Sequence, residues 1–508
     1  MAPDPAAARP LSWPVAVAAL LAGASMFLLS IIHNDFPFEY HPDEPSKVAQ
    51  LVSGTRNYNH PPLMLTLTAW TTRLLGISPR AEHFARMGRT LSAAYLAGAV
   101  ACLTIVAGWY GGTPGAAGAA VALGTNAQAV LAGHFFKEDA LFTFGLALTF
   151  LAGEAYWRRR GRTRLLLLGA AAGLALSSKY VGALAVVYAL ALAALANDGE
   201  GEFHRRSWTN LGWCALGAAA VVGLCNGWAL WEHFGQIRHG WVKGAETVGA
   251  GNQGVGAKVP HLQFVGMFFW FTPVPVLVGA GWFWVTLRDY PFRQHADRWL
   301  TGLSPLWLLA VFSFSASTAV RYFLPISLGL SCLAGIALSG GLRWAAARSC
   351  WVAKRCNART ASWAAAVFLL VFNLPGLFSL LGGFAGDDHA ALGTWIAQRL
   401  PPDAVIAQDT LAQLPLRTLP QRVASVPAVA DLGDVATLRA RGITHVVVCW
   451  YDSRRYVDPR KHSSAGDHDF LRRREFYATL PMHARSLWKG DLRQPYPLRP
   501  GLELFALD

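Results

Sequence analysis

Long apolar runs separated by short polar segments occupy most of the chain before residue 385. A run of about 20 apolar residues can cross the hydrocarbon core of a bilayer. We divide residues 165–196 at Lys179, because a charge inside one long helix is costly unless it reaches water or a partner. The sequence then predicts about eleven transmembrane helices, near residues 12–32, 89–109, 115–134, 139–157, 165–178, 181–196, 211–231, 262–287, 299–316, 322–341 and 361–384.

After about residue 385 the pattern changes to short elements of mixed polarity. The stretch LGTWIAQRLPPDAVIAQD, residues 392–409, predicts a helix, a Pro-Pro-Asp turn and a short strand. The β-branched, apolar stretch ITHVVVCW, residues 443–450, is typical of a buried strand. We therefore predict an α-helical polytopic membrane domain over 1–384, with a first outer loop at 33–88, and a small soluble α/β domain over 385–508.

The composition agrees with an integral membrane protein. Of the 508 residues, 53% are hydrophobic and 15% are charged, against about 25% charged residues in soluble proteins. The formal net charge is +14, but much of it lies in short loops between apolar runs, and no basic-aromatic module is present, so we expect no nucleic-acid partner. The seven cysteines imply no disulfide framework.

Basic loops predict the orientation in the membrane. Residues 158–164, 203–208, 288–298 and 343–359 carry clustered Arg and Lys and fall on one side of an eleven-span count. Positive loops of this length lie in the cytoplasm. We therefore expect a cytoplasmic N-terminus and an extracytoplasmic C-terminal domain, as in a bacterial inner membrane protein.

Polar segments that interrupt the apolar pattern all fall on the opposite, outer side of this topology. Acids, histidines and potential anion-binding cations are concentrated in them. Their convergence predicts one outward-facing site at the membrane surface. The segments are 33–47, 57–63 (NYNHPPL), 134–142, 178–180, 231–253 and 317–325.

This set of side chains suits glycosyl transfer from a lipid-linked donor. A carboxylate, supplied by Asp43 or Glu44, can orient or deprotonate the acceptor nucleophile. Cations such as Lys179 and Arg321, or a metal ion, can offset the charge that grows on a departing phosphate. No nucleotide-binding motif is present, which agrees with a donor activated by lipid phosphate.

The order of HPDEPSKV, NHPPL, KED, SKY and RYFLP, followed by a soluble tail, resembles the GT-C glycosyltransferases. The nearer resemblance is to the polyprenyl-phosphate-dependent group of protein O-mannosyltransferases, lipid A aminoarabinose transferase and RgtA/B/C/D-like bacterial enzymes. The resemblance extends over about residues 10–340. The soluble tail resembles these enzymes in architecture alone. The resemblance implies that Asp43 is the catalytic base or acceptor-orienting group and that Glu44 assists it or binds a metal. It also implies that Glu138 and Asp139 are the second-loop acids.

The donor-phosphate contacts implied by the resemblance are Lys179 and Arg321, to which we add Tyr322. No cofactor is required by the sequence. If a divalent metal ion is bound, its candidate ligands are Glu44, His41, His60 and His261. The expected partners are the polyprenyl-phosphate sugar, membrane lipid and an extracytoplasmic lipid, glycan or protein acceptor. Further substrate-binding candidates are His41, Lys47, Asn59, His60, Lys137 and Tyr180.

Local roles compete with these assignments. Asp43 is a good N-cap for the helix expected from SKVAQLV. Lys179 can extend to the membrane interface, Lys137 can pair locally with Glu138 or Asp139, and Asn59 can simply shape a turn.

Two other functions fit a multi-spanning protein of this kind. A transporter or flippase for a lipid-linked or anionic substrate would place charges near mid-membrane, often in two repeated halves, and no repeat is visible. A glycan polymerase or ligase would share the lipid-linked substrate, but usually relies on basic residues in large outer loops.

Overall fold

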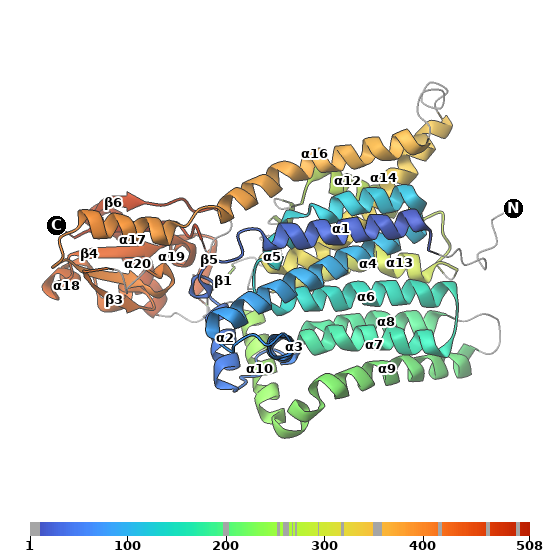
Figure 1. Ribbon diagram of the computed structural model, residues 1–508, viewed down its shortest axis with the longest axis horizontal. Helices are drawn as coiled ribbons and strands as arrows, with labels where there is room; N and C mark the ends of the chain where they lie inside the picture. The colour runs from blue at the N-terminus through green and yellow to red at the C-terminus, as the bar shows by residue number, and fades with distance from the viewer. Residues whose placement is uncertain are drawn as a thin grey trace.

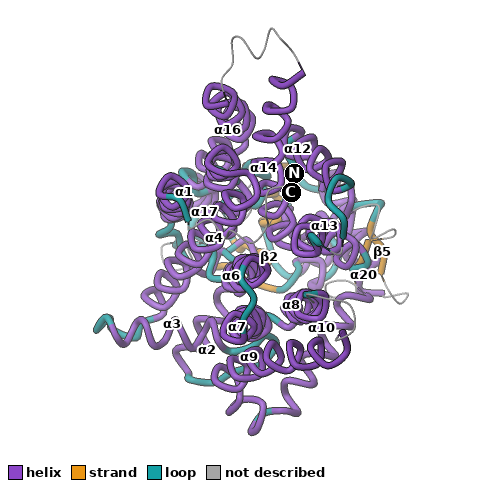
Figure 2. Tube along the Cα trace, turned by 90° about the vertical axis from the view of Figure 1, so that its right-hand side faces the viewer, coloured by secondary structure: helices purple, strands orange, loops and turns teal. Residues whose placement is uncertain are grey.

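A bundle of long helices carries a small α/β domain at one end (Figure 1). Figure 2 looks along the bundle and shows many of its helices end-on. The computed structural model describes residues 11–507 except for 197–202, 251–254, 258–263, 267, 270–271, 293, 316–319, 349–357, 415–418, 464–467 and 494–497.

Five stretches of the described chain are long and apolar enough to cross a membrane, namely α1, α4, α6, much of α9, and Ala366–Arg399 with most of α16. Three shorter apolar stretches include α8, α12 and part of α14. The structure thus supports a polytopic helical protein, and the count of about eleven spans stays a prediction. The bundle helices are α1 (Trp13–Ile31), α4 (Ala81–Gly124), α5 (Ala127–Gly133), α6 (Glu138–Arg158), α7 (Arg162–Ser178), α8 (Ala183–Leu195), α9 (Phe203–Glu232), α12 (Val274–Leu287), α13 (Ala296–Ser313), α14 (Leu324–Arg348) and α16 (Ala358–Phe384).

Gly112 divides the 44-residue α4 into two antiparallel helices. Its φ of 68° and ψ of −164° are not helical, and Pro114 follows. A methyl group built on Gly108 would lie 3.3 Å from Cβ of Ala116, which requires the chain to fold back. Gly tolerates this positive φ because it has no Cβ. A break between two helices is therefore present where the second and third spans are predicted to meet.

The helix break predicted at Lys179 is also present. Helix α7 ends at Ser178, and Lys179 has an extended backbone with φ −156° and ψ 140°. A short 3₁₀ turn, η2 (Tyr180–Gly182), leads into α8. The extended residue places a polar side chain between two apolar helices at the end of the bundle.

Short elements lie at the same end of the bundle as the candidate site. In Figure 1, helices α2, α3 and α10 lie toward the end of the bundle that carries the α/β domain. These elements are η1 (Phe38–Tyr40), α2 (Glu44–Ser53), α3 (Leu63–Leu74), α10 (Phe234–Ala250), the strand β1 (Val255–Ala257) and η3 (Val320–Phe323).

The C-terminal domain contains a mixed five-stranded sheet in the order β3-β2-β4-β7-β6. Strand β2 pairs in parallel with β3 and β4, and β7 pairs antiparallel with β4 and β6. The helix, turn and strand predicted over 392–409 and the buried strand predicted over 443–450 are confirmed. The elements are α17 (Asp388–Arg399), β2 (Val405–Asp409), η4 (Thr410–Ala412), β3 (Arg422–Val426), η5 (Val429–Leu432), α18 (Val435–Ala440), β4 (His445–Cys449), α19 (Trp450–Val457), β5 (Lys461–Ser463), α20 (His468–His483), β6 (Arg485–Lys489) and β7 (Leu502–Ala506).

The α/β domain contacts the loop over residues 33–88 directly. The Tyr40 ring stacks on His389 with centroids 4.0 Å apart, and its hydroxyl donates to Asp387 Oδ2 at 3.3 Å. A second link is the antiparallel pair β1–β5, in which Val255 is opposite Ser463. The domain is therefore held beside this end of the bundle.

Candidate functional site

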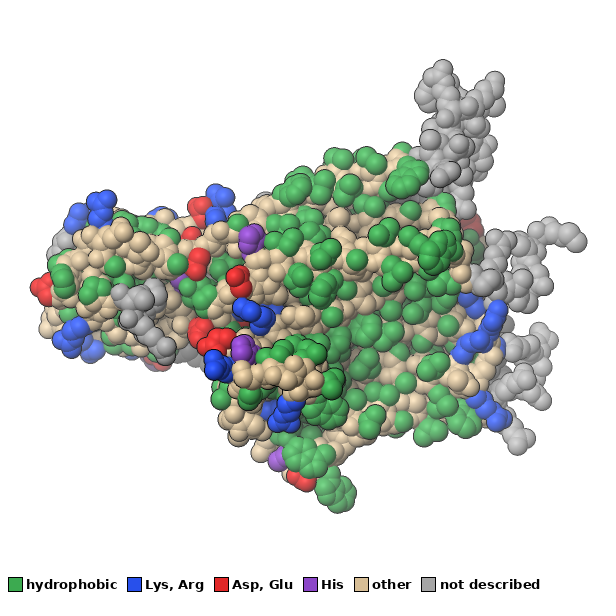
Figure 3. All heavy atoms as spheres, viewed as in Figure 1, with side chains coloured by type: hydrophobic (Ala, Val, Ile, Leu, Met, Phe, Trp, Pro, Cys, Tyr) green, Lys and Arg blue, Asp and Glu red, His purple; other side chains and the backbone are tan. Residues whose placement is uncertain are grey.

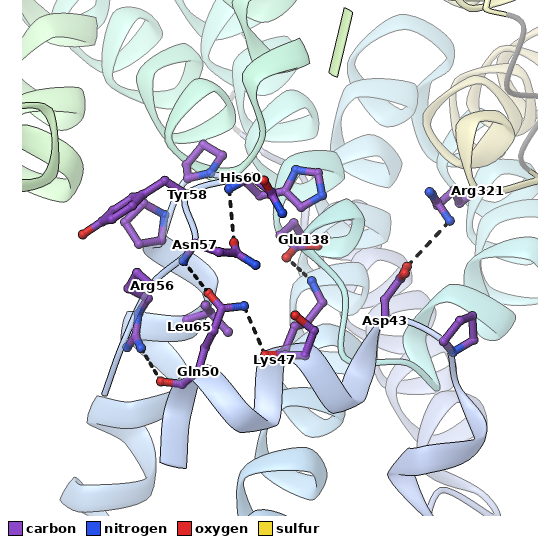
Figure 4. A pocket seen from close by; sticks show the side chains of 15 residues that line it. Asp43, Lys47, Gln50, Arg56, Asn57, Tyr58, His60, Leu65, Glu138 and Arg321 are labelled. Carbon is purple, nitrogen blue, oxygen red and sulfur yellow. Dashed lines mark hydrogen bonds and ion pairs between the residues drawn. The ribbon is translucent and has the colours of Figure 1, made fainter. Parts of the chain in front are cut away.

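A polar pocket of about 190 Å³ lies at the end of the bundle nearer the α/β domain. It is bounded by α2, by the loop before α3, by the start of α6 and by η3 (Figure 4). The pocket brings together four of the six polar segments of the sequence. Its lining residues are Pro42, Asp43, Ser46, Lys47, Gln50, Arg56, Asn57, Tyr58, Asn59, His60, Pro61, Pro62, Leu65, Glu138 and Arg321.

Asp43 presents its carboxylate to this pocket. Although it occupies the N-cap position of α2, its side chain makes no capping hydrogen bond. The carboxylate instead pairs with the amino group of Lys137 and lies 3.8 Å from Nη1 of Arg321. Its side chain is 43% exposed, so a ligand can reach it beside the two cations.

Glu44, the next residue, faces the opposite way into the protein core. It is fully buried, pairs with Arg89 at 2.5 Å and accepts a hydrogen bond from Phe136 N at 2.7 Å. Glu44 does not line the pocket. Its contacts support a positioning role for the start of α2 rather than contact with substrate.

The acids of the KED motif open helix α6. Glu138 and Asp139 lie in its first turn, where the helix dipole favours negative charge. Glu138 pairs with Lys47 and lines the pocket. Asp139 does not line the pocket and pairs instead with Lys179 at 2.6 Å.

Lys179 and Lys137 both point inward. The Lys179 side chain is only 14% exposed and is held by Asp139, so it does not extend to a membrane interface. Lys137 makes its ion pair with Asp43, not with the neighbouring Glu138 or Asp139 as the local alternative predicted. Burial, and next the charge of Arg321, lowers the pKa of Lys137 to about 7.

Tyr322 forms an aromatic support between the two cations proposed for phosphate. Nζ of Lys179 lies 5.5 Å from the centre of its ring, and Cζ of Arg321 lies 5.6 Å from it. Phe312 stacks on the same ring at 5.3 Å. Cations near a ring face are attracted by its quadrupole, so Tyr322 limits where both can lie.

The NYNHPPL loop supplies one wall of the pocket. The Asn59 N–H donates to Asn57 Oδ1 at 3.2 Å, and His60 lines the pocket beside it. The Tyr180 hydroxyl donates to the Tyr58 carbonyl at 2.9 Å, which makes Tyr180 a support of the loop. The Asn59 backbone bond agrees with a turn, while its exposed side chain stays available.

The structure does not bring the candidate metal ligands that it describes together in one place. His60 lines the pocket, but Glu44 is engaged by Arg89. His41 Nδ1 accepts a hydrogen bond from Asp43 N at 3.1 Å, and burial lowers its pKa well below the ordinary value. His261 lies outside the described residues. No group of three or more His, Cys, Asp and Glu side chains suited to a metal ion occurs in the described part of the chain.

Two arginines were not identified as site residues from the sequence. Arg89 pairs with Glu44. The sequence feature that could have indicated its role is a charge at the first position of a predicted apolar span. Arg56 lines the pocket and lies in the loop over residues 33–88, where a single arginine gives no distinct sequence signal.

Comparison with known proteins agrees with the motifs. Residues 59–231 match the family described as dolichyl-phosphate-mannose-protein mannosyltransferase. ArnT from Cupriavidus metallidurans bound to undecaprenyl phosphate has a TM-score of 0.55 and 16% identity, covering 97% of each chain. The apo form of the same protein gives 0.52 and 17%, with the same coverage. No curated protein sequence matches the chain.

The ArnT likeness, at this low identity, shows a shared fold. Together with the family match it supports a membrane glycosyltransferase of the GT-C superfamily, as the motifs predicted.

The charged side chains of the site leave a positive surplus. The opposite charges of the buried pair Glu44 and Arg89 cancel each other. In the ion-paired cluster around Asp43, which leaves out Arg56 at the other end of the pocket, four cations face three carboxylates when Lys137 is protonated, so this cluster suits a singly charged anion. The seven residues are Lys47, Lys137, Lys179 and Arg321 against Asp43, Glu138 and Asp139.

Proposed function

We propose that the protein moves a sugar from a polyprenyl-phosphate donor to an extracytoplasmic acceptor, which is a lipid, a glycan or a protein. The observation that carries this proposal is the half-exposed carboxylate of Asp43, in a polar pocket between two cations and without a capping bond. A polyprenyl-phosphate sugar is a phosphodiester with one negative charge, which matches the surplus of one cation in the ion-paired cluster around Asp43. The similar ArnT structure was solved with undecaprenyl phosphate bound.

In the proposed reaction, an oxygen of the acceptor attacks C1 of the donor sugar. The bond from C1 to the phosphate oxygen breaks, and its electron pair stays on the departing polyprenyl phosphate. Asp43 orients the acceptor and takes its proton. Arg321, Lys137 and Lys179 stabilise the charge that grows on the phosphate.

The ion pairs of the site support this sequence of events. Phosphate binding would compete with Asp43 for Lys137 and Arg321, which would release the carboxylate to accept a proton. Glu138 and Asp139 would keep Lys47 and Lys179 in place. Guanidinium groups suit phosphate because they offer two parallel donors, so Arg321 is the main phosphate contact in this scheme.

The placement of charge supports the proposed orientation. On the face shown in Figure 3, acids, histidines and cations gather where the bundle meets the α/β domain, and hydrophobic side chains cover the bundle beyond. Lys and Arg gather again at the opposite end. By the positive-inside rule, that opposite end is cytoplasmic and the pocket faces outward. Acids and histidines gathered at one end of the bundle favour an enzyme over a transporter with a mid-membrane site.

Release of free polyprenyl phosphate tests the proposal. Purified protein is incubated with a panel of polyprenyl-phosphate sugars, with membrane extract as acceptor, and wild type is compared with Asp43→Asn. We expect transfer by wild type and its loss in the variant, while thermal unfolding stays unchanged. Equal turnover by both proteins would remove Asp43 from the chemistry, and no turnover with any donor would favour a transporter.

A further inference from the structure

One end of the pocket has no part in the reaction proposed above. Figure 4 shows Arg56 and Arg321 on opposite sides of the pair formed by Lys47 and Glu138. If donor phosphate binds at Arg321, the Arg56 end is open to the carbohydrate that reacts at Asp43.

Arg56 is a cation without an acidic partner. Lys47 pairs with Glu138 and Arg321 with Asp43, but no ion pair joins Arg56 to any residue that the structure describes. Its Nη1 donates to the carbonyls of Gln50 at 2.7 Å and Thr55 at 2.8 Å. These two bonds fix the guanidinium plane.

The opposite edge of the same guanidinium remains available. Its Nε and Nη2 make no hydrogen bond to another residue within the described ranges of the chain. This edge of an arginine suits two parallel bonds to a carboxylate or phosphate. The side chain is partly exposed and lines the pocket, so an anion in the pocket can reach it.

Neutral polar groups surround this cation. Ser46, Asn57 and Asn59 are exposed and line the same pocket. Gln50 accepts the Asn57 N–H at 3.0 Å and donates to the Ser46 carbonyl at 3.1 Å, which holds the loop against α2. Hydroxyl and amide groups beside one unpaired cation fit a carbohydrate that bears an acidic group.

We propose that the Arg56 end of the pocket is a subsite for an anionic group, a carboxylate or a phosphate, on the reacting carbohydrate. The inference rests on the proposed function for its assignment to a carbohydrate. The group has two potential sources, the sugar carried by the donor and a glycan acceptor. A purely structural Arg56, which closes the end of α2 through Gln50, would not discriminate between acidic and neutral sugars.

Binding to the full-length protein in lipid nanodiscs tests the subsite. One arm compares polyprenyl-phosphate-glucuronic acid with polyprenyl-phosphate-glucose. The other compares free glucuronate and glucose 6-phosphate with glucose, with and without saturating polyprenyl phosphate. We expect the acidic ligand to bind roughly ten- to a hundredfold more tightly in one arm, the effect of a charge-assisted hydrogen-bonded pair. Arg56→Gln should abolish the preference, Arg56→Lys should keep part of it, and the exposed Arg80→Gln should keep all of it.

The outcomes separate the two proposals. A preference in the first arm assigns the anion to the donor sugar, and one in the second arm assigns it to the acceptor. If wild type shows no preference in either arm, or Arg56→Gln retains it, the subsite is wrong. Unchanged affinity for polyprenyl phosphate shows that the variant is folded. If wild type does not bind polyprenyl phosphate, the proposed function is wrong, and the arm with free acids alone decides the subsite.

Discussion

Arg89 holds the carboxylate of Glu44 inside the bundle, with Nη2 2.5 Å from Oε2 and Nε 3.1 Å from Oε1. The same guanidinium donates to the carbonyls of Asn34 and Phe36. It therefore joins the chain that follows α1 to the start of α2. Because Glu44 is anchored inward, the adjacent Asp43 is directed to the pocket.

We predict that Glu44→Gln destabilises the protein without removing a group that contacts substrate. The change leaves Arg89 as an uncompensated buried cation, and breaking a buried pair in this way costs about 3–5 kcal/mol. Thermal or denaturant unfolding of the purified protein measures the effect. Asp35→Asn, an exposed acid of the same loop, should change stability by no more than about 0.5 kcal/mol. Equal stability of Glu44→Gln and wild type would contradict the positioning role.

The helical fold was predictable because the bilayer imposes a length and polarity that are visible in the sequence. The helix break at Lys179 followed from the cost of burying a charge, and the reversal at Gly112 lay in the gap between two apolar runs. The short helix α5 was not predicted. Asn126 caps it by accepting from Ala129 N at 3.0 Å, a local bond inside an apolar run that hydropathy does not report.

The candidate site was predictable as a set of segments but not as a set of contacts. Asp43 and Glu44 are adjacent and chemically alike, and only the partner Arg89, 45 residues beyond Glu44, separates their roles. The pairing of Lys137 with Asp43 crosses 94 residues of sequence. A sequence pattern predicts on which side of the membrane a segment lies, whereas the ion-pair partner of each charged residue depends on how the helices pack.

Arg321 should affect both donor binding and turnover. Arg321→Met removes a cation that the proposed mechanism places on the phosphate, so we expect a rise in KM for the donor and a fall in kcat. The combined loss in kcat/KM should be roughly ten- to a hundredfold, since charge-assisted hydrogen bonds contribute about 1.5–3 kcal/mol. Arg321→Lys should recover part of the loss. Steady-state kinetics measure the effect, with the exposed Arg288→Gln as the control. If Arg321→Met and Arg288→Gln behave alike, this role of Arg321 is wrong.

Tyr40 should couple the first outer loop to the α/β domain. Tyr40→Ala removes the stack on His389 and the hydrogen bond to Asp387, so we expect faster proteolysis near residues 385–388. Tyr40→Phe keeps the stack and loses a bond that contributes about 0.5–1.5 kcal/mol, so its effect should be smaller. Phe38→Ala, in the same 3₁₀ turn, is the matched control. Identical cleavage rates for Tyr40→Ala and wild type would show that other contacts hold the domain.

Donor affinity should depend on pH through Lys137. Burial lowers the pKa of Lys137 to about 7, so its proton is present below that pH and lost above it. Loss of the proton removes the positive surplus of the ion-paired cluster around Asp43. We therefore expect affinity for a polyprenyl-phosphate sugar to fall as the pH rises from about 6 to about 8. In this range the phosphodiester keeps one charge, and other side chains with ordinary pKa values, apart from histidines, do not titrate.

Lys137→Arg is the decisive variant for this pH dependence. A guanidinium stays protonated throughout the range, so the variant should bind the donor with a flat pH profile. Lys137→Met, neutral at every pH, should also be flat, but at the weak affinity that wild type shows at high pH. Titrations of the three proteins by the same binding assay separate these cases. If Lys137→Arg keeps the wild-type slope, a different group, such as the pocket residue His60, governs the response.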